Sequence, residues 1–196
     1  GSSGVPEEWA AGQDRAGVNR LPDLAPATAD AVVEAMLAGR RAGDITVASI
    51  HWGGNWGYEI TPDERHFARR LVDGGAADIV HGHSSHHPKG MERHRGKLIL
   101  YGCGDFLNDY EGIGGHEAFR PWLSLMYFVT VEPASGRTTA LSMVPLAIER
   151  LRLVRARPED GEWLARRLQE AAPGEAGRIR VQAGRLVPEW SAGAAP

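Results

Sequence analysis

A strand, helix, strand pattern near the middle of the chain restricts the fold more than any other feature of the sequence. Residues 45–51 (ITVASIH) form a short β-branched run, typical of a strand that is covered on both faces. Thr61, Pro62 and Glu64 have the spacing of a capping box with proline in the first turn, which predicts the start of a helix. Residues 77–80 (ADIV) then form a second strand-like run. This order predicts a βαβ crossover with two parallel strands.

Further periodic segments predict a helix before this unit and antiparallel hairpins after it. Apolar residues at helical spacing indicate a helix over residues 28–41. The other expected elements are strands at 91–94 and 97–101, strands at 123–131 and 138–146, a helix at 158–171 and a small hairpin around 183–184. We therefore expect an α/β fold in three parts, namely a lead-in loop (1–26), a main unit (27–150) and a C-terminal helix with a small hairpin (151–196).

The composition excludes several classes of function. A length of 196 residues with 42% hydrophobic residues suits one globular domain. A formal net charge of -3 offers no basic surface for a run of phosphates, so nucleic acid is not expected as a partner. No stretch approaches the roughly 18 apolar residues of a membrane span, so we expect a soluble, cytoplasmic protein. The single cysteine, Cys103, lies in a buried-strand pattern and is expected to be a small core residue rather than a nucleophile.

Histidines cluster directly after the second predicted strand, where four of the chain's 8 lie within residues 81–87. Imidazole binds divalent metals, and loops at the carboxyl ends of parallel strands converge at one edge of a sheet. His51 ends the first predicted strand, so we expect His51 and His83 to lie within about 12 Å of each other. His86 can be aimed at the same ion. The alternative is a histidine-rich surface loop with adventitious metal affinity.

The loop after the first predicted strand combines aromatic rings, glycines and an amide. Such a loop can cradle a peptide, and its candidate substrate contacts are Trp52, Asn55, Trp56 and Tyr58. The alternative is that Trp52 and Trp56 only pack the loop against the domain.

Three motifs in this order and spacing resemble the CapA family, which is named for capsule and poly-gamma-glutamate biosynthesis and is related to the metallophosphatases. The motifs are residues 49–53 (SIHWG) with Glu59 shortly after, residues 82–86 (GHSSH) and residues 101–106 (YGCGDF). The resemblance implies a metallophosphatase-like (calcineurin-like) layered α/β sandwich, of which this chain would be the C-terminal half. It also places the chain near CapA-like epimerases that tailor lasso peptides.

The resemblance implies roles for the histidines. His51 and His83 would bind a divalent metal ion (Mn, Zn, Fe, Co or Ca), with two ions in the complete enzyme. His86 would be either a third imidazole ligand or the proton-transfer residue, and we assign it to proton transfer. Asp105, in a polar loop over residues 105–111, replaces the asparagine of many family members and is the second candidate catalytic residue.

Two segments that the family normally carries are absent from this sequence. The family opens with a Gly-Asp strand end and later has an Asn-Asn-His segment, which supply a bridging carboxylate and further ligands. We therefore expect an N-terminal half of the same enzyme as a partner, either as a separate chain or as a removed segment. A half-fold of this kind should expose a large apolar surface, because nothing covers its sheet.

Three functions are compatible with these residues. The first is metal-assisted acid/base chemistry on a peptide substrate, with Cα epimerisation of a ribosomal lasso peptide as the expected reaction. The second is metal-dependent hydrolysis of a phosphoester or an amide. The third is a non-catalytic role in capsule or poly-gamma-glutamate biosynthesis.

Overall fold

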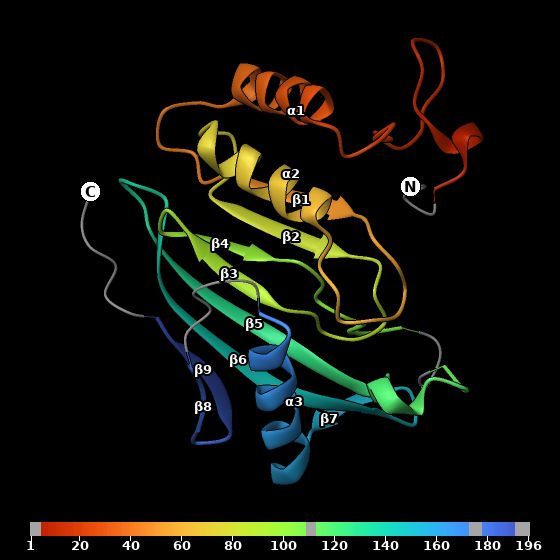
Figure 1. Cartoon of the computed structure of the whole chain (residues 1–196), viewed down its shortest axis with the longest axis vertical. Helices are drawn as coiled ribbons and strands as arrows, with labels where there is room; N and C mark the ends of the chain where they lie inside the picture. Colours follow the sequence, from red (N-terminus) through yellow and green to blue (C-terminus); the bar gives the residue numbers. More distant parts are fainter. Residues whose placement is uncertain (1–4, 109–112, 173–177, 191–196) are drawn as a thin grey trace.

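The computed structural model describes residues 5–108, 113–172 and 178–190 of the chain (Figure 1). Residues 1–4 of the expected lead-in, part of the polar loop at 109–112 and the tail at 191–196 lie outside the described residues. The elements of the described part form two sheets with three α-helices, which confirms the predicted α/β class.

The first sheet contains the predicted βαβ unit. Its strands are β1 (Val47–His51), β2 (Ile79–His83), β4 (Lys97–Leu100) and β3 (Met91–His94), in that spatial order. Strands β1, β2 and β4 are parallel, and β3 closes the sheet as the antiparallel partner of β4. The two histidine-bearing strand ends are therefore adjacent at one edge of the sheet, as predicted.

Two helices cover one face of this sheet, α1 (Pro26–Gly39) and α2 (Pro62–Asp73) (Figure 1). The predicted capping box starts α2, because the Glu64 backbone N–H donates to the Thr61 hydroxyl and the Thr61 backbone N–H donates to the Glu64 carboxylate. Apolar side chains of α2, among them Phe67 and Leu71, then pack on the sheet as one core.

The second sheet consists of antiparallel strands and lies on the other side of the first sheet (Figure 1). It contains β5 (Leu123–Glu132), β6 (Arg137–Glu149), β9 (Arg185–Glu189) and β8 (Arg178–Gln182) in spatial order, with β7 (Arg152–Arg155) paired to β6. Helix α3 (Pro158–Glu170) contacts β6, β8 and β9. Leu100, Leu125, Met143 and Leu164 belong to the second core, which joins the two sheets and α3.

Several predicted boundaries need correction. The first strand begins at Val47 rather than residue 45, and the second begins at Ile79 and continues through His83. Cys103 is buried in the second core as expected, but β4 ends at Leu100 and Cys103 forms only an isolated bridge with Pro88. The lead-in contains a short 3-10 helix, η1 (Glu7–Trp9), and a second one, η2 (Glu117–Phe119), precedes β5. Neither these turns nor β7 was predicted, because each contains only three or four residues.

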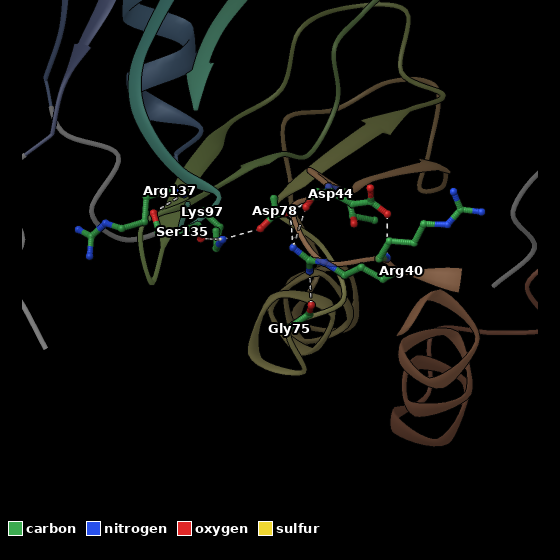
Figure 2. A network of polar contacts seen from close by, with 9 residues as sticks. Arg40, Asp44, Gly75, Asp78, Lys97, Ser135 and Arg137 are labelled. Carbon is green, nitrogen blue, oxygen red and sulfur yellow. Dashed lines mark hydrogen bonds and ion pairs between the residues drawn. The ribbon is translucent and has the colours of Figure 1, made fainter. Parts of the chain in front are cut away.

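A network of polar contacts connects the two sheets at the start of β2 (Figure 2). The carboxylate of Asp78, which is 1% exposed, accepts hydrogen bonds from Arg40 at 2.7 Å and from the Thr46 backbone N–H at 2.9 Å. Its other oxygen accepts from Lys97, which also donates to the Ser135 carbonyl in the turn between β5 and β6. One buried carboxylate thus connects segments from both sheets.

Among the described residues, no helix has both the length and the apolar character needed to cross a membrane.

Candidate acid/base and metal site

His51 and His83 face each other at the ends of the two parallel strands. The pairing register of β1 and β2 places them opposite one another, and their Nδ1 atoms are 3.2 Å apart. Their rings meet edge to face, with centroids 5.2 Å apart. Both distances are well below the limit of about 12 Å for two side chains that share a metal site.

Partial burial lowers the pKa of two histidines on β2. Burial lowers the pKa of His83, and the neighbouring His81 and His51 lower it further. Burial also lowers the pKa of His81, whose Nδ1 is 3.0 Å from the Ser49 hydroxyl. Because a metal ion binds neutral imidazole, depressed pKa values favour metal binding at neutral pH.

Glycine is required between the two histidines of β2. A Cβ atom on Gly82 would lie 2.5 Å from the indole nitrogen of Trp52 and 2.5 Å from the Tyr101 carbonyl. That indole nitrogen donates to the same carbonyl at 2.9 Å. Because Gly82 has no side chain, the buried face of β2 can pack closely against the core. His81 and His83 lie on the opposite, half-buried face of the strand.

His86 and Asp105 form an imidazole–carboxylate pair close to the histidine cluster. The Nδ1 atom of His86 lies 3.1 and 3.2 Å from the two carboxylate oxygens of Asp105, and both side chains are largely buried. A carboxylate at this position fixes the ring orientation, and Nε2 is the ring nitrogen that does not contact Asp105. The structure therefore brings together the two residues that we predicted as acid/base catalysts.

Asn55 links the two histidine loops. Its backbone carbonyl accepts from the His86 backbone N–H at 3.1 Å, and its side-chain amide nitrogen lies 3.4 Å from His86 Nε2. Ser84, between the two loops, adopts a φ of 136°, which is unusual for a residue with a side chain. Its hydroxyl donates to the Gly53 carbonyl and the Asn55 side-chain oxygen, each at 3.4 Å. Asn55 is thus a contact of His86.

The aromatic residues of the same loop divide into two groups. The Trp52 side chain is a core residue, 3% exposed and stacked on Tyr101, although Trp52 also borders the cleft beside His51. Trp56 is partly exposed and stacks on His116, with ring centroids 3.9 Å apart, and its ring lies 5.3 Å from that of His86. Tyr58 packs on His87, and burial raises the pKa of its hydroxyl. Trp56 therefore lies beside His86.

A cleft of about 700 Å³ opens beside His51. Its walls are the end of the lead-in segment, including Leu21 and Leu24, and the loop at Gly53 and Gly54. The sequence predicted the lead-in residues only as a loop. Their place in the wall of the cleft depends on residues far along the chain, which local sequence patterns do not indicate. Among the described residues, the cleft provides space for a substrate group next to His51.

A buried ion pair supports these loops and was not predicted from the sequence. Lys89 and Glu64 are 5% and 2% exposed, and their charged atoms are 3.8 Å apart. Burial lowers the pKa of Lys89, while the carboxylates of Glu64 and Glu59 oppose that shift. Gly53 has a φ of +72°, and a Cβ atom there would lie 2.3 Å from the Glu64 carboxylate. Lys89 lies two residues after the end of the histidine cluster at His87, and this position was the available signal in the sequence.

The chain offers two candidate ligands for a metal ion. His51 and His83 present two imidazoles to one point, which suits a divalent ion of intermediate softness. Within residues 5–108, 113–172 and 178–190, no three His, Cys, Asp or Glu side chains are grouped closely enough to hold an ion. The residues present fit a metal as two of its ligands, and the other protein ligands would have to come from elsewhere.

An α/β fold with histidines at the ends of parallel strands and an imidazole–carboxylate pair beside them defines a metallophosphatase-like protein. Residues 1–110 match the family described as bacterial capsule synthesis protein PGA_cap, and the chain belongs to this family. The predicted resemblance to the CapA family and the predicted fold are therefore confirmed.

Relatives with descriptive names agree with this family. A Mycobacterium tuberculosis protein named "Probable polyglutamine synthesis accessory protein" is 56% identical over 164 residues, which are 83% of this chain and 43% of the relative. The Bacillus subtilis PGA biosynthesis protein CapA is 30% identical over 98 residues, which are 50% of this chain and 26% of that protein. The Bacillus anthracis capsule biosynthesis protein CapA is 32% identical over 66 residues, which are 34% of this chain and 16% of that protein. The chain thus spans less than half the length of these relatives.

Proposed function

We propose that this chain carries the acid/base half of a metal-dependent enzyme that hydrolyses an amide bond of a peptide-like polymer during capsule or polyglutamate synthesis. The observation that carries the proposal is the His86–Asp105 pair, because His86 follows the end of β2 at which the imidazoles of His51 and His83 face each other. The names of the relatives support an amide-linked polymer as the substrate class.

His86 is the proton-transfer residue in this proposal. Its Nδ1 is held by Asp105, so Nε2 can donate a proton to the nitrogen that leaves when the amide bond breaks. Water adds across the broken C–N bond, giving one carboxylate and one amine. Asn55, beside Nε2, helps to orient the ring, and Trp56 offers an aromatic surface to the substrate chain.

His51 and His83 would hold a divalent metal ion. When bound, such an ion lowers the pKa of water and polarises a carbonyl oxygen. The two imidazoles are suited to this role because the register of β1 and β2 fixes their separation. A second ion, as expected from the family resemblance, would need carboxylate ligands in addition to these imidazoles.

The partner in this proposal is the polypeptide that the relatives carry beyond the matched region. This chain covers 43% of the mycobacterial relative, so most of that protein is available to provide the remaining ligands. In the experiments below, "complemented chain" denotes this chain co-expressed with the region of the mycobacterial relative that it does not match.

Mass spectrometry in heavy water tests the reaction. The complemented chain would be incubated with Mn²⁺ and poly-gamma-glutamate or a model peptide in ²H₂O. We expect metal-dependent cleavage with a mass gain of one water per broken bond, and cleavage slower by roughly 100-fold to 10,000-fold in the His86→Ala variant. Intact substrate in every metal and peptide combination would overturn the proposal and favour a non-catalytic role in synthesis.

Cα epimerisation is the second candidate, because a carboxylate-oriented imidazole such as His86 can remove a Cα proton from one face of the substrate. Inversion then requires a second group that returns a proton to the opposite face, and the polypeptide beyond the matched region would supply it. The same experiment separates the two reactions, because epimerisation incorporates one deuterium at Cα and leaves the backbone unbroken. Substitution of deuterium without cleavage would replace hydrolysis by epimerisation as the reaction of this site.

A further inference from the structure

Four exposed arginines without an ionic partner in the described part of the chain lie on and beside strand β7. Residues 150–157 (RLRLVRAR) contain these four arginines and no acidic residue. Within residues 5–108, 113–172 and 178–190, no side-chain hydrogen bond or ion pair involves any of them. By contrast, Arg40, Arg69 and Arg120 form ion pairs of 2.7, 2.9 and 2.6 Å with carboxylates. The term arginine row below denotes Arg150, Arg152, Arg155 and Arg157.

The arginine row borders an open edge of the second sheet. Among the described residues, β7 pairs only with β6, so its other side is free. A strand rises about 3.3 Å per residue, so Arg152 and Arg157 are roughly 17 Å apart along the chain. Side chains alternate between the two faces of a strand, so Arg152 and Arg155 project on opposite sides of this edge. A ligand that lies along the edge would therefore meet guanidinium groups on both sides.

Protection of the edge is the simpler explanation of these charges, because charged side chains on an edge strand prevent pairing with other strands. Strand β8 is also an edge strand of this sheet, and its Arg180 is paired with Glu189 at 2.6 Å. The arginine row has no such partner, and four neighbouring like charges repel one another. A bound anion would remove this repulsion, whereas edge protection gives no reason for leaving every charge unpaired.

The sheet places the arginine row beside the segment that leads to the candidate site. Ala147 of β6 is paired with Leu123 on one side and with Val154 on the other. The start of β5 and strand β7 therefore flank the same end of β6 (Figure 1). The 3-10 helix η2 lies directly before this start of β5.

Contacts of η2 continue from the arginine row to the loop beside His86. Arg157 is the N-cap residue of α3, and Asp160 in the first turn binds Arg120 at 2.6 Å. The ring of Phe119, next to Arg120, lies 5.5 Å from that of Trp56. Because Trp56 lies beside His86, a long ligand bound along β7 could extend over η2 to the candidate site.

The charges fit a flexible chain that carries many carboxylates. A guanidinium group binds a carboxylate through two parallel hydrogen bonds. Duplex nucleic acid and lipid surfaces present their charge over a wide area, whereas the row is one strand wide on a chain with a net charge of -3. Each exposed arginine–carboxylate contact is weak, but several along one polymer act together.

We propose that the arginine row is a docking site for a polymer with a carboxylate on each residue, such as poly-gamma-glutamate, separate from the acid/base site. The proposal rests on the proposed function in so far as the docked polymer is also the substrate. Docking itself requires neither a metal ion nor turnover, so it can be measured independently of the reaction.

Fluorescence anisotropy of labelled poly-gamma-glutamate with the complemented chain, in EDTA and at low salt, tests the docking site. We expect the double variant Arg152→Gln, Arg155→Gln to weaken binding about tenfold, because two charged contacts are lost. The matched control is Arg166→Gln, Arg178→Gln, which removes the same charge from two exposed, unpaired arginines on α3 and β8. The control should stay within about twofold of the parent chain.

Several outcomes would overturn the docking site. Equal weakening in the two double variants would mean that overall charge, and not the arginine row, attracts the polymer. Aggregation of the β7 variant with unchanged polymer binding would leave edge protection as the role of the row. Tighter binding of single-stranded DNA or of phosphatidylglycerol vesicles through Arg152 and Arg155 would identify phosphate as the ligand and also exclude the carboxylate polymer.

Turnover separates this proposal from the proposed function. With Mn²⁺, the β7 variant should raise the KM for long poly-gamma-glutamate about tenfold and leave the cleavage of a short model peptide unchanged, since a short peptide cannot reach both sites. A complex that binds the polymer through the arginine row but cleaves no amide would overturn only the proposed function. Cleavage of the long polymer with the same KM in the parent and the variant would overturn only the docking site.

Discussion

The orientation of single imidazole rings determines what the candidate site can do. His83 shares a ring-to-ring contact with His51, whereas His86 is held by a carboxylate on another loop. The environment of His83 suits a metal ligand, because a second imidazole beside it can bind the same ion. The environment of His86 suits proton transfer, because an acid or base needs a partner that orients its ring.

Replacement of each histidine should therefore affect a different property. In the complemented chain, we expect His83→Ala to reduce both metal content and activity. His86→Ala should retain most of the metal but lose roughly 100-fold to 10,000-fold in rate. Elemental analysis and turnover rates on the same preparations would check this. Loss of stoichiometric metal from His86→Ala would instead make His86 a third ligand.

His87 should make the stability of the chain depend on pH. It is fully buried against Phe119 and Tyr58, and burial lowers its pKa to about 4. The unfolded chain binds a proton near pH 6.5 and the folded chain only near pH 4, so stability present above pH 6.5 is lost as the pH falls. We expect this residue to lower the free energy of unfolding by about 2 kcal/mol between pH 7 and pH 5.

His87→Phe tests this assignment, since phenylalanine fills a similar volume and cannot be protonated. Urea unfolding at pH 7 and pH 5 should show a pH-dependent loss about 2 kcal/mol smaller in the variant than in the parent chain. Equal losses in the two proteins would mean that protonation of His87 does not cause the pH dependence.

At the scale of a single element, helix α2 shows how local sequence fixes a helix start. Thr61 and Glu64 satisfy each other's backbone N–H groups, and Glu64 also approaches the buried Lys89. The cap therefore fixes the beginning of α2 beneath the loop that follows His51.

Removing the cap should destabilise the chain by a moderate amount. We expect Thr61→Ala to lower the free energy of unfolding by about 1 kcal/mol, because the Glu64 backbone N–H loses its acceptor. Thr61→Ser retains the hydroxyl and is the matched control, with stability close to that of the parent chain. Denaturant unfolding monitored by circular dichroism measures both, and equal effects of the two substitutions would show that the hydroxyl is not important.

Over the whole molecule, one buried carboxylate holds segments from both sheets. Asp78 binds Arg40, Lys97 and the backbone of Thr46, and Lys97 reaches the turn between β5 and β6 (Figure 2). Removing a partner from a buried ion pair leaves the remaining charges without compensation.

Asp78→Asn should therefore be strongly destabilising. We expect a loss of about 3 kcal/mol in the free energy of unfolding, since two cations would lose their common anion. Asp30→Asn is the control, because the Asp30–Arg70 pair is about half exposed and should contribute less than about 1 kcal/mol. Thermal and urea unfolding of both variants would check the comparison, and similar losses would contradict the structural role of Asp78.

The local sequence determined the elements and the candidate chemistry of this chain. Apolar periodicity and the capping box at Thr61 predicted α2, the hairpins and the parallel order of β1 and β2, because these signals depend on residues close together in the chain. The clustering of histidines then predicted the pairing of His51 with His83, since ends of adjacent parallel strands must meet.

Only the tertiary structure decided which of these side chains are available for chemistry. Trp52 has the same local signal as Trp56, yet it fills the core because Gly82 and Tyr101 leave space for its ring. The pairing of His86 with Asp105 and the cleft beside the lead-in segment also depend on contacts between distant segments. Burial is set by what packs over a residue from elsewhere in the chain, and the residue's own neighbours in sequence do not specify it.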